Sequence, residues 1–106
     1  MADNYHNPKP EYILCAAIHF DDEQQYVNQP LNITSGFVIS GRRHHNCFGT
    51  AFLIHDQKTT YLKHEKAQGF LTSKDRFVSR EEAAIIAFEQ GQTIKLHETL
   101  FSEDLY

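Results

Sequence analysis

Cysteines, basic residues and long apolar runs are scarce in this chain of 106 residues, and each scarcity argues against a class of protein. The two cysteines, Cys15 and Cys47, stand far apart without a CxxC pair, so we expect buried free thiols rather than a zinc module or a disulfide scaffold. Ten basic against fourteen acidic residues give a net charge of -4, which disfavours large nucleic acids as partners. No apolar run is long enough to span a bilayer, and the polar start MADNYHNPKP is unlike a secretory signal. We therefore expect a cytoplasmic protein without membrane contact.

The rest of the composition is that of one folded domain. An apolar share of 41%, eight Phe, five Tyr and 23% charged residues are typical of a soluble globular protein. The length is common for a single domain, and the sequence contains neither an internal repeat nor a low-complexity linker. We expect residues 1–106 to form one domain, with residues 1–10 as a flexible N-terminal arm.

The first part of the sequence predicts three strands. The continuous apolar run EYILCAAIHF, residues 11–20, is typical of a buried strand. The polar turn DDEQQ leads into YVNQP, residues 26–30, which we expect to pair with the first strand as a hairpin and to end at Pro30. The β-branched and aromatic residues at 34–39 predict a third strand that ends at Ser40 and Gly41.

Two helices are expected, each directly after a strand. From Arg42, through HHNCFGTAFLIH, apolar residues return at three- and four-residue steps, which predicts a helix with Ser40 as its N-cap. Ser79 and Glu82 match a capping box ahead of AAIIAFEQ, and Gly91 follows as a stop. This second helix is the best-marked element of the sequence.

The segments around the second helix complete the expected architecture. TTYLKH, residues 59–64, predicts a short strand, and AQGFLTSKDRFVS, residues 67–79, predicts two strands around a Ser-Lys-Asp turn. The tail TIKLHETLFSEDLY has an ambiguous period, with one strand and then an acidic end as its interpretation. The predicted fold is therefore α+β, an antiparallel β-sheet with two α-helices in a single domain.

All four arginines lie at the starts of the two expected helices, whereas the six lysines are scattered. Guanidinium groups bind phosphate in a bidentate manner, and a helix N-terminus favours an anion by ~0.3 to 1 kcal/mol. An arginine at such a position opposes the helix dipole, which suggests that an external anion is expected there. We therefore predict that Arg42, Arg43, Arg76 and Arg80 bind the phosphate groups of a ligand.

An alternative is that these arginines form ordinary surface ion pairs. Arg80 can pair with the acidic residues at 75, 81 or 82, and Arg42 with the acidic tail or with residues 21–22. Such exposed pairs contribute little to stability, typically about 0 to 1 kcal/mol. The concentration of all four arginines in two places favours the anion site.

A nucleotide ligand also needs an aromatic face for its base, since base stacking contributes ~1 to 3 kcal/mol. Phe77 lies between Arg76 and Arg80 and is one candidate. Strand alternation, however, points Phe77 away from the face that holds Arg76 and favours a core position. Tyr61 and Phe70 are left open.

An enzymatic alternative rests on the two histidines beside the first arginine pair. His44 and His45 can act as acid and base on a phosphodiester, with Arg42 or Arg43 stabilising the transition state. A Cys47 nucleophile with His44 as its base lacks a family signature, and a metal site on the same two residues lacks further ligands in a recognisable pattern. A small phosphodiesterase therefore stays as the alternative function.

The segments GFVISGRRHHNCF and QGFLTSKDRFVSREEAAIIAFEQGQ, with the ending LFSEDLY, resemble small proteins of bacteriophages and prophages. Taken together they resemble the Thoeris anti-defence family of the first-described kind, from about residue 12 onward. The resemblance implies a homodimer that can assemble further in the infected bacterial host, with pockets at subunit interfaces. It also implies binding of cyclic ADP-ribose isomers, and in some members of cyclic oligonucleotides, without their cleavage and without a cofactor.

Carried onto this sequence, the resemblance implies phosphate or ribose contacts from Arg43, Arg76 and Arg80. The expected ligand-binding set is Arg42, Arg43, His44, Arg76, Phe77 and Arg80. The expected function is sequestration, in which tight binding lowers the free cyclic nucleotide below the concentration that a host effector needs. A protein-interaction module that acts through the acidic SEDLY end is a third possibility.

Overall fold

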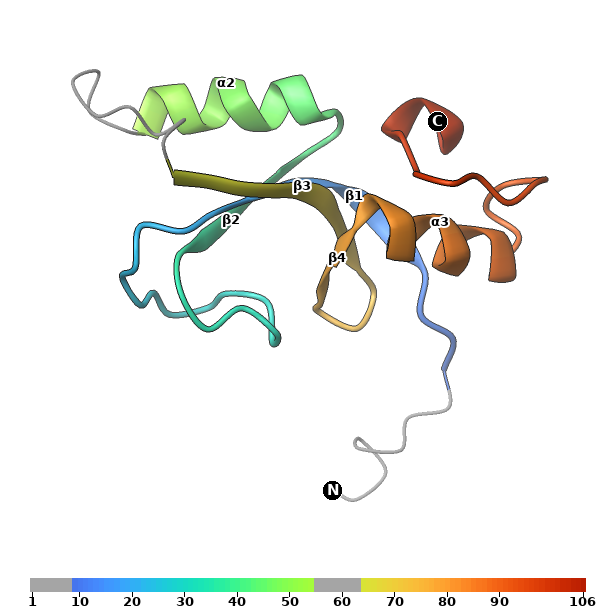
Figure 1. The fold of residues 1–106 in the computed structure, drawn as a ribbon, viewed down its shortest axis with the longest axis horizontal. Helices are drawn as coiled ribbons and strands as arrows, with labels where there is room; N and C mark the ends of the chain where they lie inside the picture. The colour runs from blue at the N-terminus through green and yellow to red at the C-terminus, as the bar shows by residue number, and fades with distance from the viewer. Residues whose placement is uncertain (1–8, 55–63) are drawn as a thin grey trace.

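The computed structural model describes residues 9–54 and 64–106 of the chain. It contains a four-stranded antiparallel sheet in the order β2-β1-β3-β4 and two α-helices, which confirms the predicted α+β fold (Figure 1). Residues 1–8 of the expected N-terminal arm and most of the expected strand at 59–64 lie outside the described residues. The elements in chain order are β1 (Ile13–Phe20), β2 (Phe37–Gly41), α2 (His44–Ile54), β3 (Glu65–Thr72), β4 (Phe77–Ser79), α3 (Arg80–Glu89) and the short 3-10 helix η2 (Ser102–Asp104).

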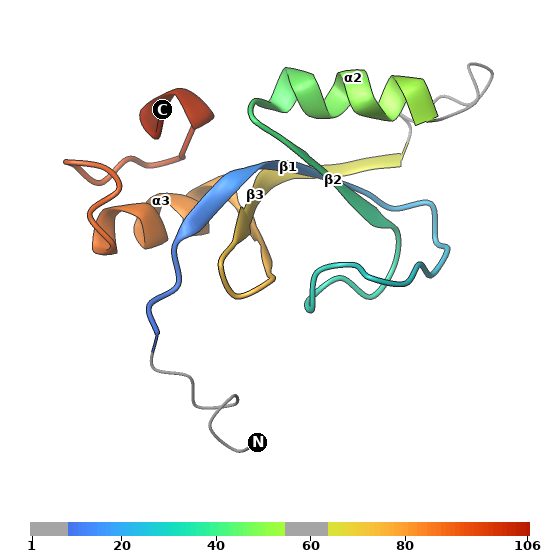
Figure 2. The same cartoon turned by 180° about the vertical axis from the view of Figure 1, so that it is seen from behind.

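The hydrophobic core lies on one face of the sheet. β1 is central and pairs with both β2 and β3, and its alternate residues Ala16, Ile18 and Phe20 are fully buried in the core. Both helices contribute to the same core, α2 through Cys47 and Ala51 and α3 through its buried alanines. Figures 1 and 2 show α2 along this face of the sheet, and the long loop between β1 and β2 on the other side.

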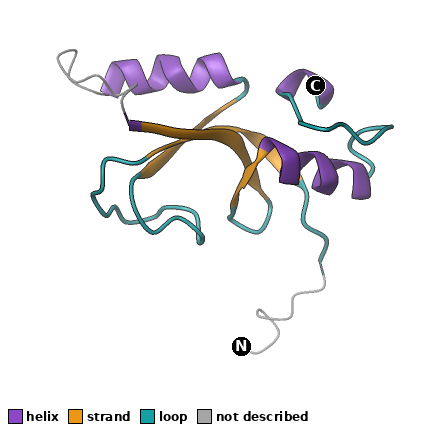
Figure 3. Ribbon diagram, viewed as in Figure 1, coloured by secondary structure: helices purple, strands orange, loops and turns teal. Residues whose placement is uncertain are grey.

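The expected second strand at residues 26–30 does not form. The whole stretch 21–36 is a loop, and β1 pairs with β2 instead (Figure 3). Polar side chains of the loop bind their own backbone and one another. Asp21 Oδ1 accepts hydrogen bonds from the Glu23 amide at 3.0 Å and from the Ser35 hydroxyl at 2.6 Å. Residues 26–30 have no strand to pair with, because β2 occupies the place beside β1, and the prediction of a strand there is wrong.

Three amide side chains bind main-chain groups at the edges of the strands. Asn32 donates to the Phe77 carbonyl at 2.7 Å and accepts from the Phe77 amide at 2.8 Å, on β4. Gln92 forms the same pair of bonds with Ile13 on β1, both at 2.8 Å. Gln29 accepts from a main-chain amide of β2 at 2.8 Å. These amides satisfy backbone groups that have no strand beside them.

Helix α2 begins at His44, later than predicted. Ser40 still belongs to β2 and pairs with β1, so it is not the N-cap that the sequence indicated. Arg43 takes that place. Its carbonyl accepts from the Asn46 amide at 3.0 Å, and the Asn46 side chain accepts from the Arg43 amide at 3.1 Å. Because strand pairing continues through Gly41, Arg43 is fixed at the junction between the sheet and the helix.

The predicted hairpin and second helix are confirmed. β3 and β4 pair on either side of a short turn, and Ser79 caps α3 by accepting a hydrogen bond from the Glu82 amide at 3.1 Å. The Glu82 carboxylate binds Arg76 at 2.8 Å instead of completing the capping box. Gly91, at φ 74°, follows the helix end in the left-handed conformation that a glycine adopts readily.

The chain after α3 folds back without forming the expected strand, since residues 92–106 contain only turns, coil and η2. Leu100 is fully buried in the core, and its amide donates to the Arg80 carbonyl at 3.0 Å. We call residues 100–106 the C-terminal segment. It lies beside the starts of both helices, which is where the functional candidates were expected (Figure 1).

Candidate functional site

The C-terminal segment brings together one arginine from each predicted cluster. Arg43, immediately before α2, donates through Nη1 to the Ser102 hydroxyl at 3.0 Å and through Nη2 to the main-chain oxygen of Tyr106. Arg80, the first residue of α3, donates through Nη1 to the Leu100 carbonyl at 2.9 Å. Both guanidinium groups therefore bind within the same seven residues of chain.

Each of these arginines also lies against an aromatic ring. The guanidinium carbon of Arg43 is 4.9 Å from the centroid of Tyr106, and that of Arg80 is 4.8 Å from the centroid of Phe101. Both distances are in the range of cation–π attraction. Tyr106 is 42% exposed and Phe101 is 51% exposed, so both residues are accessible from solvent. Exposed Arg42 lies 5.9 Å from the Tyr106 ring.

The oxygens that hold Arg43 and Arg80 are not acidic side chains. Arg80 donates its second bond, at 2.9 Å, to the amide oxygen of Gln68. Among residues 9–54 and 64–106, no Asp or Glu side chain lies within 4.0 Å of either guanidinium. Burial lowers the pKa of Arg80, and the charge of Glu103 opposes this, but an arginine stays protonated at neutral pH. Both guanidinium groups thus bind the C-terminal segment without an Asp or Glu side chain of the described residues at salt-bridge distance.

His44 positions the start of α2 against β3. Its Nε2 is 2.8 Å from the Gly69 carbonyl, so this nitrogen carries the proton. The ring also meets Phe70 edge to face at 5.2 Å, and Phe70 itself is fully buried. Burial lowers the pKa of His44, and Arg80 lowers it further, whereas the bond to Gly69 opposes both. His44 is therefore neutral at pH 7, and its Nε2–H is already engaged.

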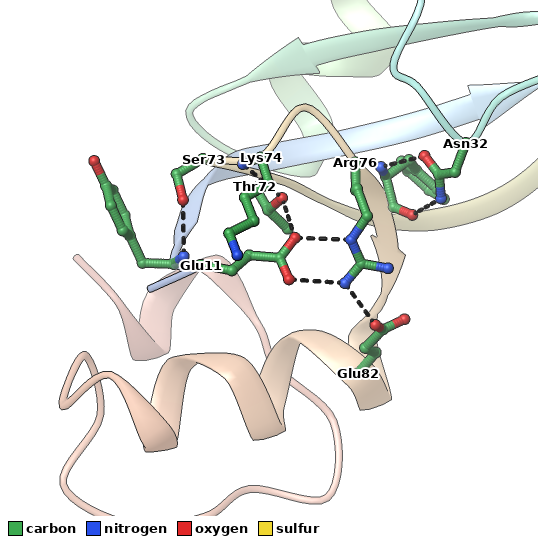
Figure 4. Close-up of polar contacts among 9 residues, drawn as sticks. Glu11, Asn32, Thr72, Ser73, Lys74, Arg76 and Glu82 are labelled. Atoms are coloured by element: carbon green, nitrogen blue, oxygen red, sulfur yellow. Dashed lines mark hydrogen bonds and ion pairs between the residues drawn. The ribbon is translucent and has the colours of Figure 1, made fainter. Parts of the chain in front are cut away.

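Arg76 has a different environment from Arg43 and Arg80. Its Nε and Nη2 bind the two carboxylate oxygens of Glu11 at 2.8 and 2.9 Å, and Nη2 also binds Glu82 at 2.8 Å (Figure 4). These bonds, with Glu11 first, raise the pKa of Arg76. The ion-pair interpretation therefore describes Arg76, although its main partner is far away in the sequence.

Phe77 lies in the interior and not at the C-terminal segment. It is 9% exposed, and its ring centroid is 5.8 Å from that of His19. Phe77 is buried, as strand alternation favoured, but it does not belong to the main core cluster, which includes its neighbour Val78 instead. Tyr61, the other aromatic residue left open, lies outside the described residues.

The side chains named in the enzymatic alternative have different environments and do not form one group. Burial raises the pKa of the Cys47 thiol to about 11, so it is protonated at neutral pH and packs as an uncharged group. His45 is exposed, whereas His44 is bound to a carbonyl. In the described part of the chain, no group of three or more His, Cys, Asp or Glu residues could hold a metal ion.

Sequence reasoning did not single out four residues of this site, namely Gln68, Phe101, Ser102 and Tyr106. A signal was present in FSEDLY, where two aromatic residues flank the acidic pair. The sequence does not reveal that this segment folds back, because Arg43 and Ser102 are 59 residues apart. The contact depends on the burial of the segment's first residue in the core.

The chain matches a known protein family over nearly its whole length. Residues 12–106 match the family described as Phage T4 y16D protein. No curated protein and no solved structure matches the chain. Within the described residues, no helix is long and apolar enough to cross a membrane. The matched range includes both arginines and the whole C-terminal segment.

Proposed function

Because the chain belongs to the phage T4 y16D protein family, we propose that it binds and sequesters a cyclic nucleotide immune signal of the infected bacterial host. The observation that carries this proposal is the convergence of Arg43 and Arg80 on the C-terminal segment, with no Asp or Glu side chain of the described residues paired to either. A ligand with two phosphate groups offers negatively charged oxygens that can bind both guanidinium groups. A cyclic ADP-ribose isomer and a cyclic oligonucleotide both have this chemistry.

The same site also contains two aromatic rings on which a base of such a ligand can stack. Phosphate oxygens would replace the main-chain oxygen of Tyr106 on Arg43 and the carbonyl of Leu100 on Arg80. The half-exposed rings of Tyr106 and Phe101 then offer stacking surfaces, each contributing ~1 to 3 kcal/mol. With charge-assisted hydrogen bonds of ~1.5 to 3 kcal/mol each, binding near 1 nM, about 12 kcal/mol, is attainable.

The environments of His44 and His45 favour binding of the ligand without its cleavage. A phosphodiesterase needs an acid and a base that both reach the reacting phosphate. The Nε2–H of His44 is donated to Gly69, and His45 points to solvent. Sequestration needs only affinity, because each bound signal molecule is removed from the host effector.

The proposed partners are this ligand and further copies of the chain, in the host cytoplasm. The outer side of α3 exposes Ile85 and Phe88, and the segment after it exposes Ile94 and Leu96. An apolar surface of this kind is typical of contact between proteins. No large nucleic acid is expected as a partner, because the net charge is -4.

The first prediction is that a cyclic ADP-ribose isomer or a cyclic oligonucleotide binds, raises the melting temperature, and is recovered intact after the protein is denatured by heat. Arg43→Ala and Arg80→Ala should each weaken binding by at least about tenfold, the loss of one charge-assisted contact. Titration calorimetry measures the affinity, and chromatography of the supernatant identifies the released nucleotide.

Arg76→Ala is the matched control for this experiment. Its guanidinium is held by Glu11 and Glu82, so the change should lower stability and leave the nucleotide affinity unaltered. Recovery of a hydrolysed nucleotide would favour the phosphodiesterase. Equal affinity of Arg43→Ala, Arg80→Ala and the unaltered protein would refute the proposed site.

A further inference from the structure

A separate hollow of about 300 Å³ lies between the chain entering β1 and the turn that joins β3 to β4. It is lined by Lys9, Pro10, Tyr12, Ser73 and Lys74. No lining residue takes part in the contacts of Arg43 or Arg80 with the C-terminal segment. The hollow is therefore a different site from the one proposed above, and its volume is at the lower end of small-ligand pockets.

The two walls of the hollow are joined by main-chain hydrogen bonds. The Tyr12 amide donates to the Ser73 hydroxyl oxygen at 3.0 Å, and the Ser73 amide donates to the Tyr12 carbonyl at 2.9 Å. The Lys74 amide donates to the Thr72 hydroxyl oxygen at 3.2 Å, which fixes the turn (Figure 4). Walls held in this way need little reordering when a ligand binds.

The described residues that line the hollow include two lysines and no acidic side chain. The nearby carboxylate of Glu11 accepts hydrogen bonds from Arg76 and Thr72, and the Arg76 bond in particular lowers its pKa (Figure 4). Within residues 9–54 and 64–106, no carboxylate lies within 4.0 Å of the Lys74 ammonium group.

Tyr12 and Ser73 give the hollow further means of recognition. The Tyr12 side chain is 45% exposed, so part of its ring is open to a planar partner. The Ser73 hydroxyl oxygen accepts the Tyr12 amide, and its own hydrogen can be donated to a ligand oxygen. The hollow thus combines a cation, a hydroxyl donor and an aromatic face.

We propose that this hollow binds a phosphomonoester that carries a planar ring, a ligand of the mononucleotide class. Lys74 and Ser73 hold the phosphate, and Tyr12 stacks on the ring. The volume suits one nucleotide rather than two. No sequence motif marks this site, because its walls come from segments 61 residues apart.

The test uses the full chain with adenosine 5′-monophosphate, inorganic phosphate and adenosine as separate probes. Adenosine monophosphate should shift the amide NMR signals of Ser73 and Lys74 and bind about tenfold more tightly than inorganic phosphate, because Tyr12 adds stacking. Adenosine alone should bind more weakly than the monophosphate. Tyr12→Leu should reduce the affinity for the monophosphate to that for phosphate, and Lys74→Ala should weaken both about tenfold.

Lys66→Ala is the matched control, since Lys66 is an exposed lysine whose nearest carboxylate is that of Asp21 at 3.8 Å. It should leave both affinities unchanged. The proposal is overturned if the monophosphate does not shift the Ser73 and Lys74 signals, or if Lys66→Ala weakens binding as much as Lys74→Ala. Arg43→Ala should not affect these signals, so failure here is distinguishable from failure of the cyclic nucleotide site.

Discussion

The guanidinium of Arg76 is held by two carboxylate side chains, whereas those of Arg43 and Arg80 bind a hydroxyl, a side-chain amide and main-chain oxygens. An ion-paired guanidinium offers little net attraction to another anion, because its charge is already balanced at contact distance. A guanidinium on a hydroxyl or a carbonyl keeps its charge for a ligand. The same residue type thus has a structural role in one place and a proposed binding role in another.

The ion pair of Glu11 predicts a pH-dependent stability. The bond with Arg76 lowers the pKa of Glu11, so its stabilising contribution is complete above the ordinary value of about 4.3 and is lost as the pH falls through the lowered value. Glu11→Gln should therefore destabilise the protein by about 1 to 2 kcal/mol at pH 7, and by less at pH 3. We expect this modest free-energy contribution for the salt bridge because the Arg76 side chain is 35% exposed to solvent.

Urea denaturation at pH 7 and pH 3 measures this difference. Glu89→Gln, at an exposed residue of α3, is the control and should change the free energy of unfolding by less than about 0.5 kcal/mol at both values. A Glu11→Gln effect that is equally large at pH 3 would show that packing, and not the charge, is responsible.

The sequence reveals the arginine clusters but not the partner of each arginine. The clustering is local and can be read from GRRHH and KDRFVSREE. The choice of partner depends on tertiary contact, since Glu11 is 65 residues from Arg76 and Ser102 is 59 residues from Arg43. Residue spacing alone carries no information at such separations.

Side-chain amides take the place of neighbouring strands at several edges. Asn32 binds both main-chain groups of Phe77 on β4, and Gln92 binds both of those of Ile13 on β1. An amide has the same donor and acceptor pair as a peptide group, so it satisfies the edge without a further strand. The loop of residues 21–36 thereby covers β4 while remaining irregular.

Removal of the Asn32 amide should weaken β4. Asn32→Ala leaves the N–H and C=O of the nearly buried Phe77 without their partner, for an expected loss of about 2 kcal/mol. Amide hydrogen exchange at Phe77 should become faster, and thermal unfolding should occur at a lower temperature. Gln25→Ala, at an exposed position of the same loop, should change neither. Unchanged exchange at Phe77 would show that water replaces the amide at no cost.

Elements with local signals were predicted well, and elements defined by distant pairing were not. Ser79 and Gly91 mark α3 because capping depends on residues within a few positions. The segment at 26–30 has strand-like residues but no partner strand, because β2 occupies the place beside β1. The prediction of Ser40 as the N-cap is wrong for the same reason, since its pairing with β1 extends β2.

The C-terminal segment joins the site to the core of the whole molecule. Leu100 is fully buried among residues of the sheet and both helices, and Ser102 is nearly so. The arrangement of Arg43, Arg80 and the two aromatic rings therefore depends on the same packing that stabilises the fold. Function and stability are expected to be linked through this one side chain.

Leu100→Ala tests this dependence. A buried leucine replaced by alanine typically destabilises a protein by about 2 to 5 kcal/mol, and we expect a single unfolding transition shifted to lower temperature. Far-ultraviolet circular dichroism and tyrosine fluorescence should change together. Leu96→Ala, at an exposed leucine of the preceding turn, should have little effect. A first transition seen by fluorescence alone would mean that the segment unfolds independently of the core.

The amides of Gln29, Asn32 and Gln92 have one more consequence, which concerns behaviour in concentrated solution. Fibrous aggregation commonly starts when a foreign chain hydrogen-bonds to an open strand border. Here an incoming chain has to displace an intramolecular amide before it gains its first bond. The protein can thus reach a high concentration in a crowded cell without polymerising along these borders.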